Sequence, residues 1–413
     1  MDPALHPVPL RRPRRAGTRP ARRHGRAPTT IAALALAIGT AAGGIAGAGP
    51  AGATASAGIA AAPAGAANAQ ALAANAPGGV AAPAPVAQAP AGAMNAPAGV
   101  AALAGSVTRA GVQAAATAAL AAESTPIGFG AGTTGGAAGS TVTVTSYAQL
   151  VAEAKSADPR IIRISGVIQG AQEAIYVTSN KTIVGVGGNS GLVNGGFFVK
   201  KASNVIIRNL RISYAQAPVD LIQIQKSDHV WVDHNELFND TTHDKDYYDG
   251  LLDINHGSDL ITVSWNRLHD HFKGSLVGHS DKNAAEDTGK LKVTYSHNWF
   301  EGVQARLPRL RFGTVHVYNN FFSNAVTSGI HCLMGAQCLV QNNVFRNVNL
   351  PIWTTEDSPV DGFAVQNGND FGGATPVITQ VGTFSTPPYS VTMEPVSAVE
   401  SSVKSGAGTG KVG

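Results

Sequence analysis

An asparagine that returns at the same place in a short apolar motif constrains this 413-residue chain more than any other feature. The motif reads apolar-x-apolar-x-x-Asn-x-Leu/Phe, and its asparagines are Asn235, Asn266, Asn298, Asn320 and Asn343. Successive asparagines are separated by 31, 32, 22 and 23 residues. A period near 22 residues, lengthened in places by an inserted loop, is typical of one turn of a parallel β-helix.

The physical chemistry of stacked coils explains this motif. Alternate apolar side chains point inward and stack into a core. Each asparagine would lie above the last at a tight turn, adopt left-handed backbone and extend an amide ladder along the axis. A β-sandwich or propeller would instead favour Asn-Gly or Asp-Gly hairpin turns, which are sparse between the repeats. The repeat therefore predicts an all-β parallel β-helix with loop excursions, preceded by one short helix that Ser146 caps.

Composition divides the chain near residue 125. Residues 1–124 are nearly all Ala, Gly, Pro and Arg, and they carry a net charge of +7 out of a chain total of +4. Such a segment has too little apolar surface to offset the entropy of ordering it. The folded catalytic domain is therefore predicted at 125–413, with a net charge of −3. Nucleic-acid binding, which requires basic residues on a folded face, is not expected.

Residues 1–57 have the layout of an export signal with a basic leader. An arginine-rich segment precedes a short apolar run at 31–38 and small-residue cleavage patterns at 53–57. A weak membrane anchor or a basic tail is the alternative. Residues 58–124 predict a disordered Ala/Pro/Gly-rich linker. The protein is thus expected to be secreted and extracellular, with no membrane attachment after export.

The chain has two cysteines, Cys332 and Cys338. In an exported protein they are candidates for a disulfide. Two buried thiols on neighbouring strands are the alternative, and the sequence does not choose between them.

An acidic cluster carries the first candidate chemistry. Asp249 and Asp253 are four residues apart in a predicted strand and so project from one face, with Asp220 upstream beside another strand. Like charges side by side repel, and oxygen-only ligands suit a hard cation such as Ca²⁺. A solvated acidic face is the alternative.

A basic cluster follows the acidic one. Lys273 precedes Arg306, Arg309 and Arg311, which lie around Pro308, a residue that excludes regular helix there. Several cations near an acidic metal site suit a polyanionic substrate that bears carboxylates. A surface network of salt bridges is the alternative.

Several motifs in one order resemble the pectate lyase family, polysaccharide lyase family 1. They are Trp231-Val-Asp-His234, Asp249-Gly-Leu-Leu-Asp253, Leu276-Val-Gly-His-Ser-Asp281, Val293-Thr-Tyr-Ser-His-Asn298 and Arg306-Leu-Pro-Arg-Leu-Arg-Phe-Gly313. The resemblance covers nearly all of 125–413 and implies a right-handed, pectin-lyase-like parallel β-helix. It also implies that Asp220, Asp249 and Asp253 bind Ca²⁺.

The same resemblance implies roles for the cations. Lys273 and Arg311 would bind uronate carboxylates, and Arg306 would be the base that takes the C5 proton. Because a free guanidinium has a pKa above 12, such a base predicts activity that rises above neutral pH. Asn255 stands where many relatives carry a basic residue, which puts one substrate contact in question.

The implied activity is that of a monomeric polysaccharide lyase that cleaves α-1,4-linked polygalacturonate by Ca²⁺-dependent β-elimination to unsaturated oligogalacturonides. One alternative is a pectin lyase acting on methyl-esterified pectin without calcium, which typically lacks the Asp249 and Asp253 pair. The other is a non-catalytic β-helix that binds wall polysaccharide, which would lose Arg306 or Lys273. Whether cleavage is endo or exo does not follow from the sequence.

Overall fold

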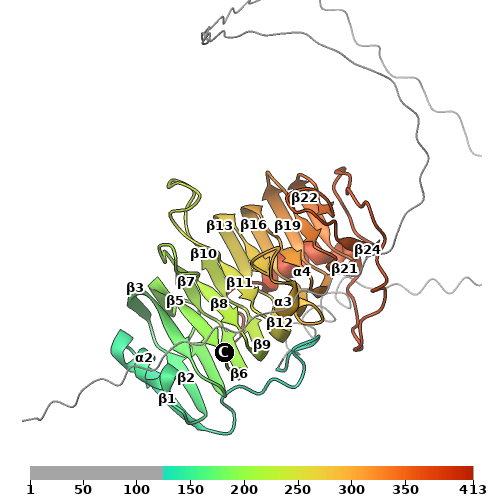
Figure 1. Ribbon diagram of the computed structural model, residues 1–413. Coiled ribbons are helices and arrows are strands. Elements are labelled where there is room, and N and C mark those ends of the chain that lie inside the picture. The colour runs from blue at the N-terminus through green and yellow to red at the C-terminus, as the bar shows by residue number, and fades with distance from the viewer. Residues whose placement is uncertain (1–123, 413) are drawn as a thin grey trace, which may run out of the picture. The chain divides into compact units, whose positions relative to one another are not determined.

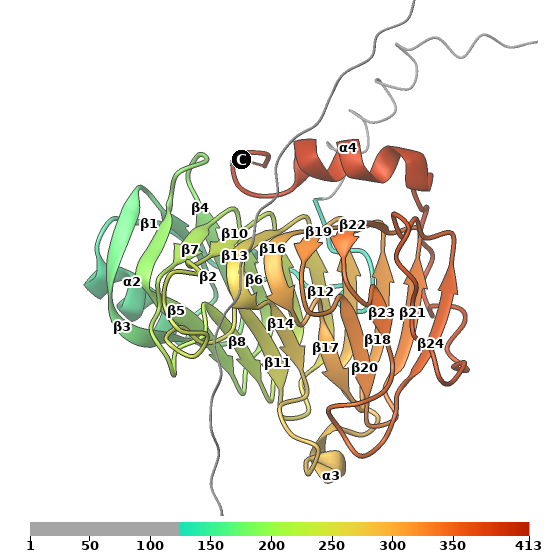
Figure 2. The same cartoon turned by 90° about the horizontal axis from the view of Figure 1, so that it is seen from above.

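A computed structural model describes residues 124–412, and in this part of the chain parallel strands stack into a β-solenoid of about ten turns (Figures 1 and 2). The parallel β-helix expected from the repeat is therefore confirmed. The predicted export signal at 1–57 lies outside the described residues, as does nearly all of the predicted linker at 58–124. No helix within 124–412 is long and apolar enough to cross a membrane.

From β6 to β23, each turn contributes one strand to each of three columns. The first column is a ten-stranded sheet of β1 (Ser140–Val144), β2 (Arg160–Ile164), β4 (Lys181–Gly185), β6 (Ser203–Arg208), β9 (Asp228–Asp233), β12 (Asp259–Ser264), β15 (Lys292–Ser296), β18 (Thr314–Tyr318), β21 (Gln337–Gln341) and β24 (Phe363–Asn367). The second column holds β7 (Arg211–Ser213), β10 (Glu236–Phe238), β13 (Arg267–Lys273), β16 (Trp299–Ala305), β19 (Phe321–Ala325) and β22 (Val344–Val348).

The third column carries the residues of greatest interest. It holds β8 (Ile222–Gln225), β11 (Leu252–Asn255), β14 (Ser275–Val277), β17 (Arg309–Arg311), β20 (Ile330–Leu333) and β23 (Ile352–Trp353). The long strands β3 (Val167–Val177) and β5 (Gly191–Lys200) pair with each other, and β5 also pairs with both β7 and β8. Because β5 spans both columns, they join into one 14-stranded sheet.

The interior is a continuous apolar core, as the alternation in the repeat predicts. The last position of the motif is fully buried in every coil that carries it, and in the C-terminal coils it is phenylalanine. The rings of Phe300 and Phe322 stack with centroids 5.1 Å apart, and those of Phe322 and Phe345 with centroids 4.6 Å apart. Stacked identical side chains thus fix the register from coil to coil.

The asparagines form the expected ladder. The side-chain oxygen of Asn298 accepts from both the backbone and the side-chain nitrogen of Asn266, each at 3.0 Å, and the same double contact repeats along the ladder as far as Asn369. From Asn235 to Asn343 these amides are buried, so the ladder satisfies backbone N–H groups that water cannot reach.

The expectation that the ladder asparagines adopt left-handed backbone is wrong by one residue. The positive φ belongs to the residue before each of them, which is His234, Trp265, His297, Asn319 or Asn342. Trp265 stacks on His297 with ring centroids 4.3 Å apart and on His234 at 5.8 Å. Stacking of these side chains compensates a conformation that is unfavourable for bulky residues.

Within residues 124–412, three helices flank the coils. The predicted N-terminal helix is α2 (Tyr147–Lys155), and the Ser146 side chain accepts from Gln149 N as its cap. This helix covers the first coil and buries Leu150 and Ala154. The others are α3 (Ala284–Asp287), in a loop after β14, and α4 (Val396–Gly406), whose Val399 and Val403 pack on β19 and β22.

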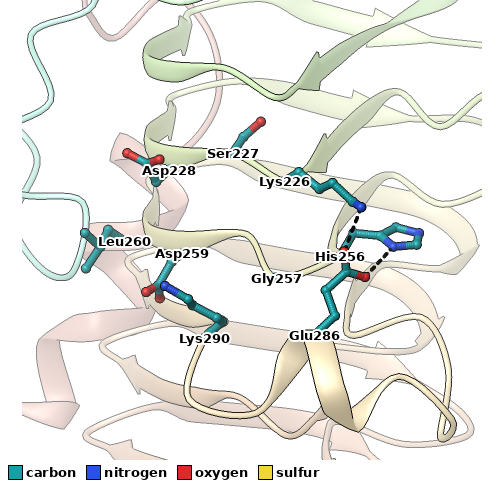
Figure 3. A pocket seen from close by; sticks show the side chains of 9 residues that line it. All are labelled: Lys226, Ser227, Asp228, His256, Gly257, Asp259, Leu260, Glu286 and Lys290. Carbon is teal, nitrogen blue, oxygen red and sulfur yellow. Dashed lines mark hydrogen bonds and ion pairs between the residues drawn. The ribbon is translucent and has the colours of Figure 1, made fainter.

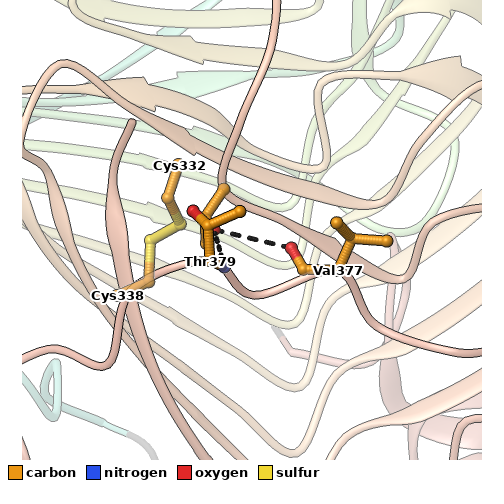
Figure 4. Close-up of a disulfide and its surroundings, with 5 residues drawn as sticks. Cys332, Cys338, Val377 and Thr379 are labelled. Carbon is orange, nitrogen blue, oxygen red and sulfur yellow. Dashed lines mark hydrogen bonds between the residues drawn. A yellow bond between two sulfur atoms is a disulfide. The ribbon is translucent and has the colours of Figure 1, made fainter. Parts of the chain in front are cut away.

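The two cysteines form a disulfide, which decides between the alternatives that the sequence left open. Cys332 lies in β20 and Cys338 lies in β21, and both are buried. Figure 4 shows the bond beside Val377 and Thr379. The bridge joins the third column to the first column of the next coil.

Candidate active site

The predicted site residues lie on four neighbouring coils of the third column. Asp220 precedes β8, Asp249 precedes β11, Lys273 precedes β14, and Arg306 precedes β17. These turns stack directly, because Leu221 N donates to Gly250 O, Leu251 N to Lys273 O, and Ser275 N to Arg306 O. Residues as distant as 220 and 306 are thereby brought onto one edge of the sheet.

Two of the predicted metal ligands converge on Gly250. A Cβ atom at Gly250 would lie 2.4 Å from Asp253 Oδ1 and 3.0 Å from Asp220 Oδ1. Gly250 N donates to Asp220 Oδ1 at 2.7 Å, and Gln223 Nε2 donates to Asp220 Oδ2 at 2.8 Å. A glycine is required here because any side chain would displace the carboxylate oxygens.

The electrostatics of this pair disfavour negative charge. Burial, reinforced by the neighbouring Asp253 and Asp249 carboxylates, raises the pKa of Asp220 well above its usual value. Burial also raises the pKa of Asp253 to about 7, although the nearby Arg306 guanidinium opposes the shift. A bound cation would relieve both effects, since it favours the ionised carboxylates.

Lys273 supplies positive charge to this cluster. Its Nζ lies 3.3 Å from Asp249 Oδ1 and 3.3 Å from Asp246 Oδ1. Within residues 124–412, no group of three or more His, Cys, Asp or Glu side chains is already arranged around a common ion position. Asp249 therefore contacts Lys273, while Asp220 and Asp253 remain together at Gly250. By donor chemistry, with carboxylate oxygens and no sulfur or nitrogen, these residues fit a hard divalent cation.

His271 is a residue that the sequence did not single out. It is buried, and its Nε2 donates to the backbone oxygen of Asp249 at 2.6 Å. Burial lowers the pKa of His271 to about 4, so the ring is neutral near pH 7. Its contact positions the turn that carries Asp249. The sequence held one signal for His271, because it lies two residues before Lys273 in the same strand and so shares its face.

Arg306 stands apart from the other arginines. Arg306 comes directly after β16, its backbone is left-handed (φ 64°), and the residue is half-buried. Among the described residues none forms a hydrogen bond or ion pair with its guanidinium, which acts on Asp253 only through its field. A cation near the Asp253 carboxylate that has no partner within residues 124–412 is available to a ligand.

Arg309 and Arg311 are already paired with acids. Arg311 Nε contacts Asp281 Oδ1, and its Nη1 donates to Gly278 O at 3.1 Å. Arg309 Nη1 lies 3.3 Å from Asp357 Oδ2, and burial together with Arg311 lowers the pKa of Arg309. These contacts join β17 to two loops.

A separate hollow of about 420 Å³ lies where the third column turns into the first (Figure 3). Its charges neutralise one another, because Glu286 pairs with Lys226 at 2.9 Å and with His256 Nδ1 at 2.8 Å. None of the predicted site residues lines it. The hollow is therefore distinct from the four-coil site.

Asn255 ends β11 next to this region. It is buried, and its Oδ1 has no hydrogen-bond partner within the described part of the chain. A buried, neutral amide there leaves the cations of the site to Lys273 and the arginines.

Comparisons with known proteins agree with this geometry. Residues 41–412 match the profile of a family described as "Pectate lyase". The chain is 46% identical over 284 residues to "Pectate lyase B" of Colletotrichum gloeosporioides, with 68% of this chain and 85% of that protein covered. It is 47% identical over 259 residues to "Pectate lyase plyB" of Emericella nidulans, covering 62% of this chain and 79% of that protein.

Solved structures show the same similarity. Pectate lyase Bsp165PelA from Bacillus sp. N165, in complex with trigalacturonate, superimposes with a TM-score of 0.64 at 31% identity, over 70% of this chain and 100% of that chain. A pectate lyase bound to a hexasaccharide superimposes with a TM-score of 0.59 at 26% identity, over 69% of this chain and 97% of that chain.

Proposed function

The chain belongs to the pectate lyase family, and from that premise we propose a Ca²⁺-dependent β-elimination in which each charged side chain of the four-coil site has a separate role. It is a polysaccharide lyase that acts on polygalacturonate. Members of this family are commonly calcium-dependent, and we assign the ion to Asp220, Asp249 and Asp253. The observation that carries the proposal is the charge order across the coils. Carboxylates lie on two of them, and Lys273 and Arg306, which has no partner among the described residues, lie on the next two.

The reaction begins at C5 of a galacturonate residue. The C5 proton lies α to a carboxylate, so its removal places negative charge on that group. When bound, Ca²⁺ would neutralise carboxylate charge and act as a Lewis acid. Arg306 would take the proton as a neutral guanidine, a form that alkaline pH favours and that no hydrogen-bonded acid within residues 124–412 opposes.

The remaining residues would stabilise the transition state and position the chain. Lys273 would release its contact with Asp249 and face the substrate carboxylate, and Arg311 would bind a neighbouring uronate while Asp281 holds its Nε. Fixed cations aimed at developing negative charge lower the barrier without reorganisation. The electron pair left at C5 then forms the C4=C5 double bond as the C4–O bond breaks, the leaving oxygen takes a proton from water, and a 4,5-unsaturated sugar remains.

We also propose the chain organisation that the sequence predicts. Residues 1–57 would direct export, residues 58–124 would form a linker, and residues 125–413 would act outside the cell as a monomer. The solved relatives support a catalytic domain of this length, because about 70% of the chain covers nearly their whole length.

Ultraviolet absorbance of unsaturated products tests the proposal directly. The full chain is mixed with polygalacturonate at alkaline pH, with Ca²⁺ or with a chelator. We expect absorbance to grow only with Ca²⁺. Cleavage of methyl-esterified pectin regardless of chelator would indicate a pectin lyase. If folded protein gives no increase in absorbance with either substrate, the chain would be a binding protein.

Two variants test the residue roles. Arg306→Ala should lower kcat by about 10²- to 10⁴-fold, the usual effect of losing a general base, with the fold retained. Asp253→Ala should raise the Ca²⁺ concentration needed for activity. Arg163→Ala, at an exposed position of β2, is the matched control and should leave both quantities unchanged. A flat pH profile above neutrality would contradict Arg306 as the base.

A further inference from the structure

A row of outward-facing side chains runs from the four-coil site toward the N-terminal coils. Strand register pairs each member with the next, across β11, β8, β5 and β3. From the site outward, the members are Asp253, Gln223, Phe198 and Tyr176. The residues flanking Tyr176, Ile175 and Val177, are buried in the core, so alternation turns the tyrosine ring to the outer face.

A second row runs parallel to the first, two residues farther along each strand. It contains Asn255, Gln225 and Lys200, again in direct register. Lys200 is exposed, and its Nζ lies 5.0 Å from the centroid of the Phe198 ring. The two rows thus bring a lysine and an aromatic pair together on β3 and β5.

The aromatic pair presents one open face. Tyr176 is 47% exposed, whereas Phe198 beside it on β5 is 7% exposed, and their ring centroids are 5.1 Å apart. Phe198 therefore packs against Tyr176 from one side and leaves the rest of the tyrosine ring available. Since neighbouring parallel strands are about 4.8 Å apart, Tyr176 lies about 14 Å from Asp253 along the sheet.

An exposed aromatic ring beside a lysine has the chemistry that recognises a uronate. A sugar ring presents C–H groups that pack on an aromatic face, and its carboxylate pairs with an ammonium group. We propose that Tyr176 and Lys200 form a distal subsite for a galacturonate residue remote from the bond that is cleaved. This inference rests on the proposed function, because it takes the polysaccharide to continue along the same rows.

The subsite predicts a dependence on substrate length. A long chain placed at Arg306 reaches Tyr176, whereas a trimer held at the site is too short to cover the three strand spacings between Asp253 and Tyr176 as well. The contact is the same in the ground state and the transition state. Its loss should therefore raise KM and leave kcat unchanged.

Steady-state kinetics of the full chain on polygalacturonate and on trigalacturonate test this prediction. Tyr176→Ala and Lys200→Ala should each raise KM for polygalacturonate by about 3- to 10-fold and leave kcat/KM for trigalacturonate unchanged. Lys200→Arg should retain most of the affinity for the polymer.

Two controls match these variants. Val167→Ala removes a 55% exposed apolar side chain from the other half of β3, and Lys155→Ala removes a cation from α2. Neither should alter KM for either substrate. An equal loss on both substrates, or no loss on the polymer, would overturn the subsite.

Failure of the subsite can be told from failure of the proposed function. Absence of any eliminative cleavage by the wild-type chain would contradict the function alone. In that case, calorimetric titration with polygalacturonate still tests the subsite. Tyr176→Ala should weaken binding of the polymer, and Val167→Ala should not.

Discussion

At the scale of single residues, Asp253 is held where the folded protein disfavours its charge. Its side chain is buried, Asp220 lies on the other side of Gly250, and the pKa is raised from 3.8 to about 7. A group whose folded pKa is raised makes the native state bind a proton that the unfolded chain releases. The free energy of unfolding therefore falls as pH rises from about 4 to about 7.

Asp253→Asn should consequently stabilise the calcium-free protein at alkaline pH while it impairs metal binding. The amide keeps an oxygen for the Leu276 N–H and removes the charge. At about pH 8 we expect a gain of up to about 4 kcal/mol, the equivalent of the pKa shift, and little gain below about pH 4. Denaturant unfolding in chelator measures it.

The comparison isolates Asp253 from other titrating groups. His271, His316 and His331 have pKa values lowered to about 4 by burial, which makes stability fall as pH drops from about 6.5 toward 4. They are present in both proteins and cancel in the difference. Added Ca²⁺ should stabilise the wild type more than the variant. A variant no more stable than the wild type at about pH 8 would refute this account.

At the scale of the element, the ladder shows how one side chain type organises a coil. The Asn298 side chain accepts two bonds from Asn266 and donates to Val263 O and Asn320 Oδ1. Its oxygen is the partner of a buried backbone N–H in the preceding coil. The ladder therefore couples each turn to both neighbours.

Asn298→Ala should lower the free energy of unfolding by about 2 to 4 kcal/mol, because buried donors lose their acceptor. Asn369→Ala, at the half-buried end of the ladder, is the matched comparison. Water can replace its amide, so about 1 kcal/mol is expected. Equal losses in denaturant unfolding would show that burial does not set the cost.

The sequence predicted the coils because the ladder asparagine, the inward apolar pair and the buried Leu/Phe recur in one order. It could not place the left-handed residue, since the position before the asparagine holds His, Trp or Asn, and bulky residues give no signal for positive φ. The stacking of Trp265 with His297 that stabilises this conformation exists only between coils.

The predicted site residues were brought onto neighbouring coils, but their partners were missed. Asp246 contacts Lys273, Asp281 contacts Arg311, and Asp357 contacts Arg309. All three acids lie in loops, whose paths between strands depend on tertiary contacts. Register follows from the repeat, whereas a contact between a strand residue and a loop residue 30 or 48 positions away has no periodic signature.

At the scale of the whole molecule, the described residues contain a complete hydrophobic core from Val144 to Ala364. The segment before β1 also belongs to the fold, because Phe129 N donates to Thr294 Oγ1 and Gly130 N to Thr262 Oγ1, each at 3.0 Å. This segment runs along the first column and joins coils that are far apart in sequence.

A chain of residues 125–413 should therefore unfold at the same temperature as the full chain and keep its kcat/KM. A chain of residues 157–413 lacks the same segment, β1 and α2, so it exposes the edge of β2 and the core under Leu150. It should melt several degrees lower or fail to fold. Calorimetry compares the three chains. A lower melting temperature for 125–413 than for the full chain would contradict the proposed boundary.

The unequal spacing of the ladder asparagines has a consequence for how such a molecule can change. Excursions between coils differ in length, yet every strand of the third column keeps its register with the next. Doubling a loop adds only about 0.6 kcal/mol of closure entropy. Evolution, or a protein engineer, can therefore lengthen, shorten or exchange the loops around the four-coil site one at a time. The coils keep their register, so the positions of the reactive side chains do not change.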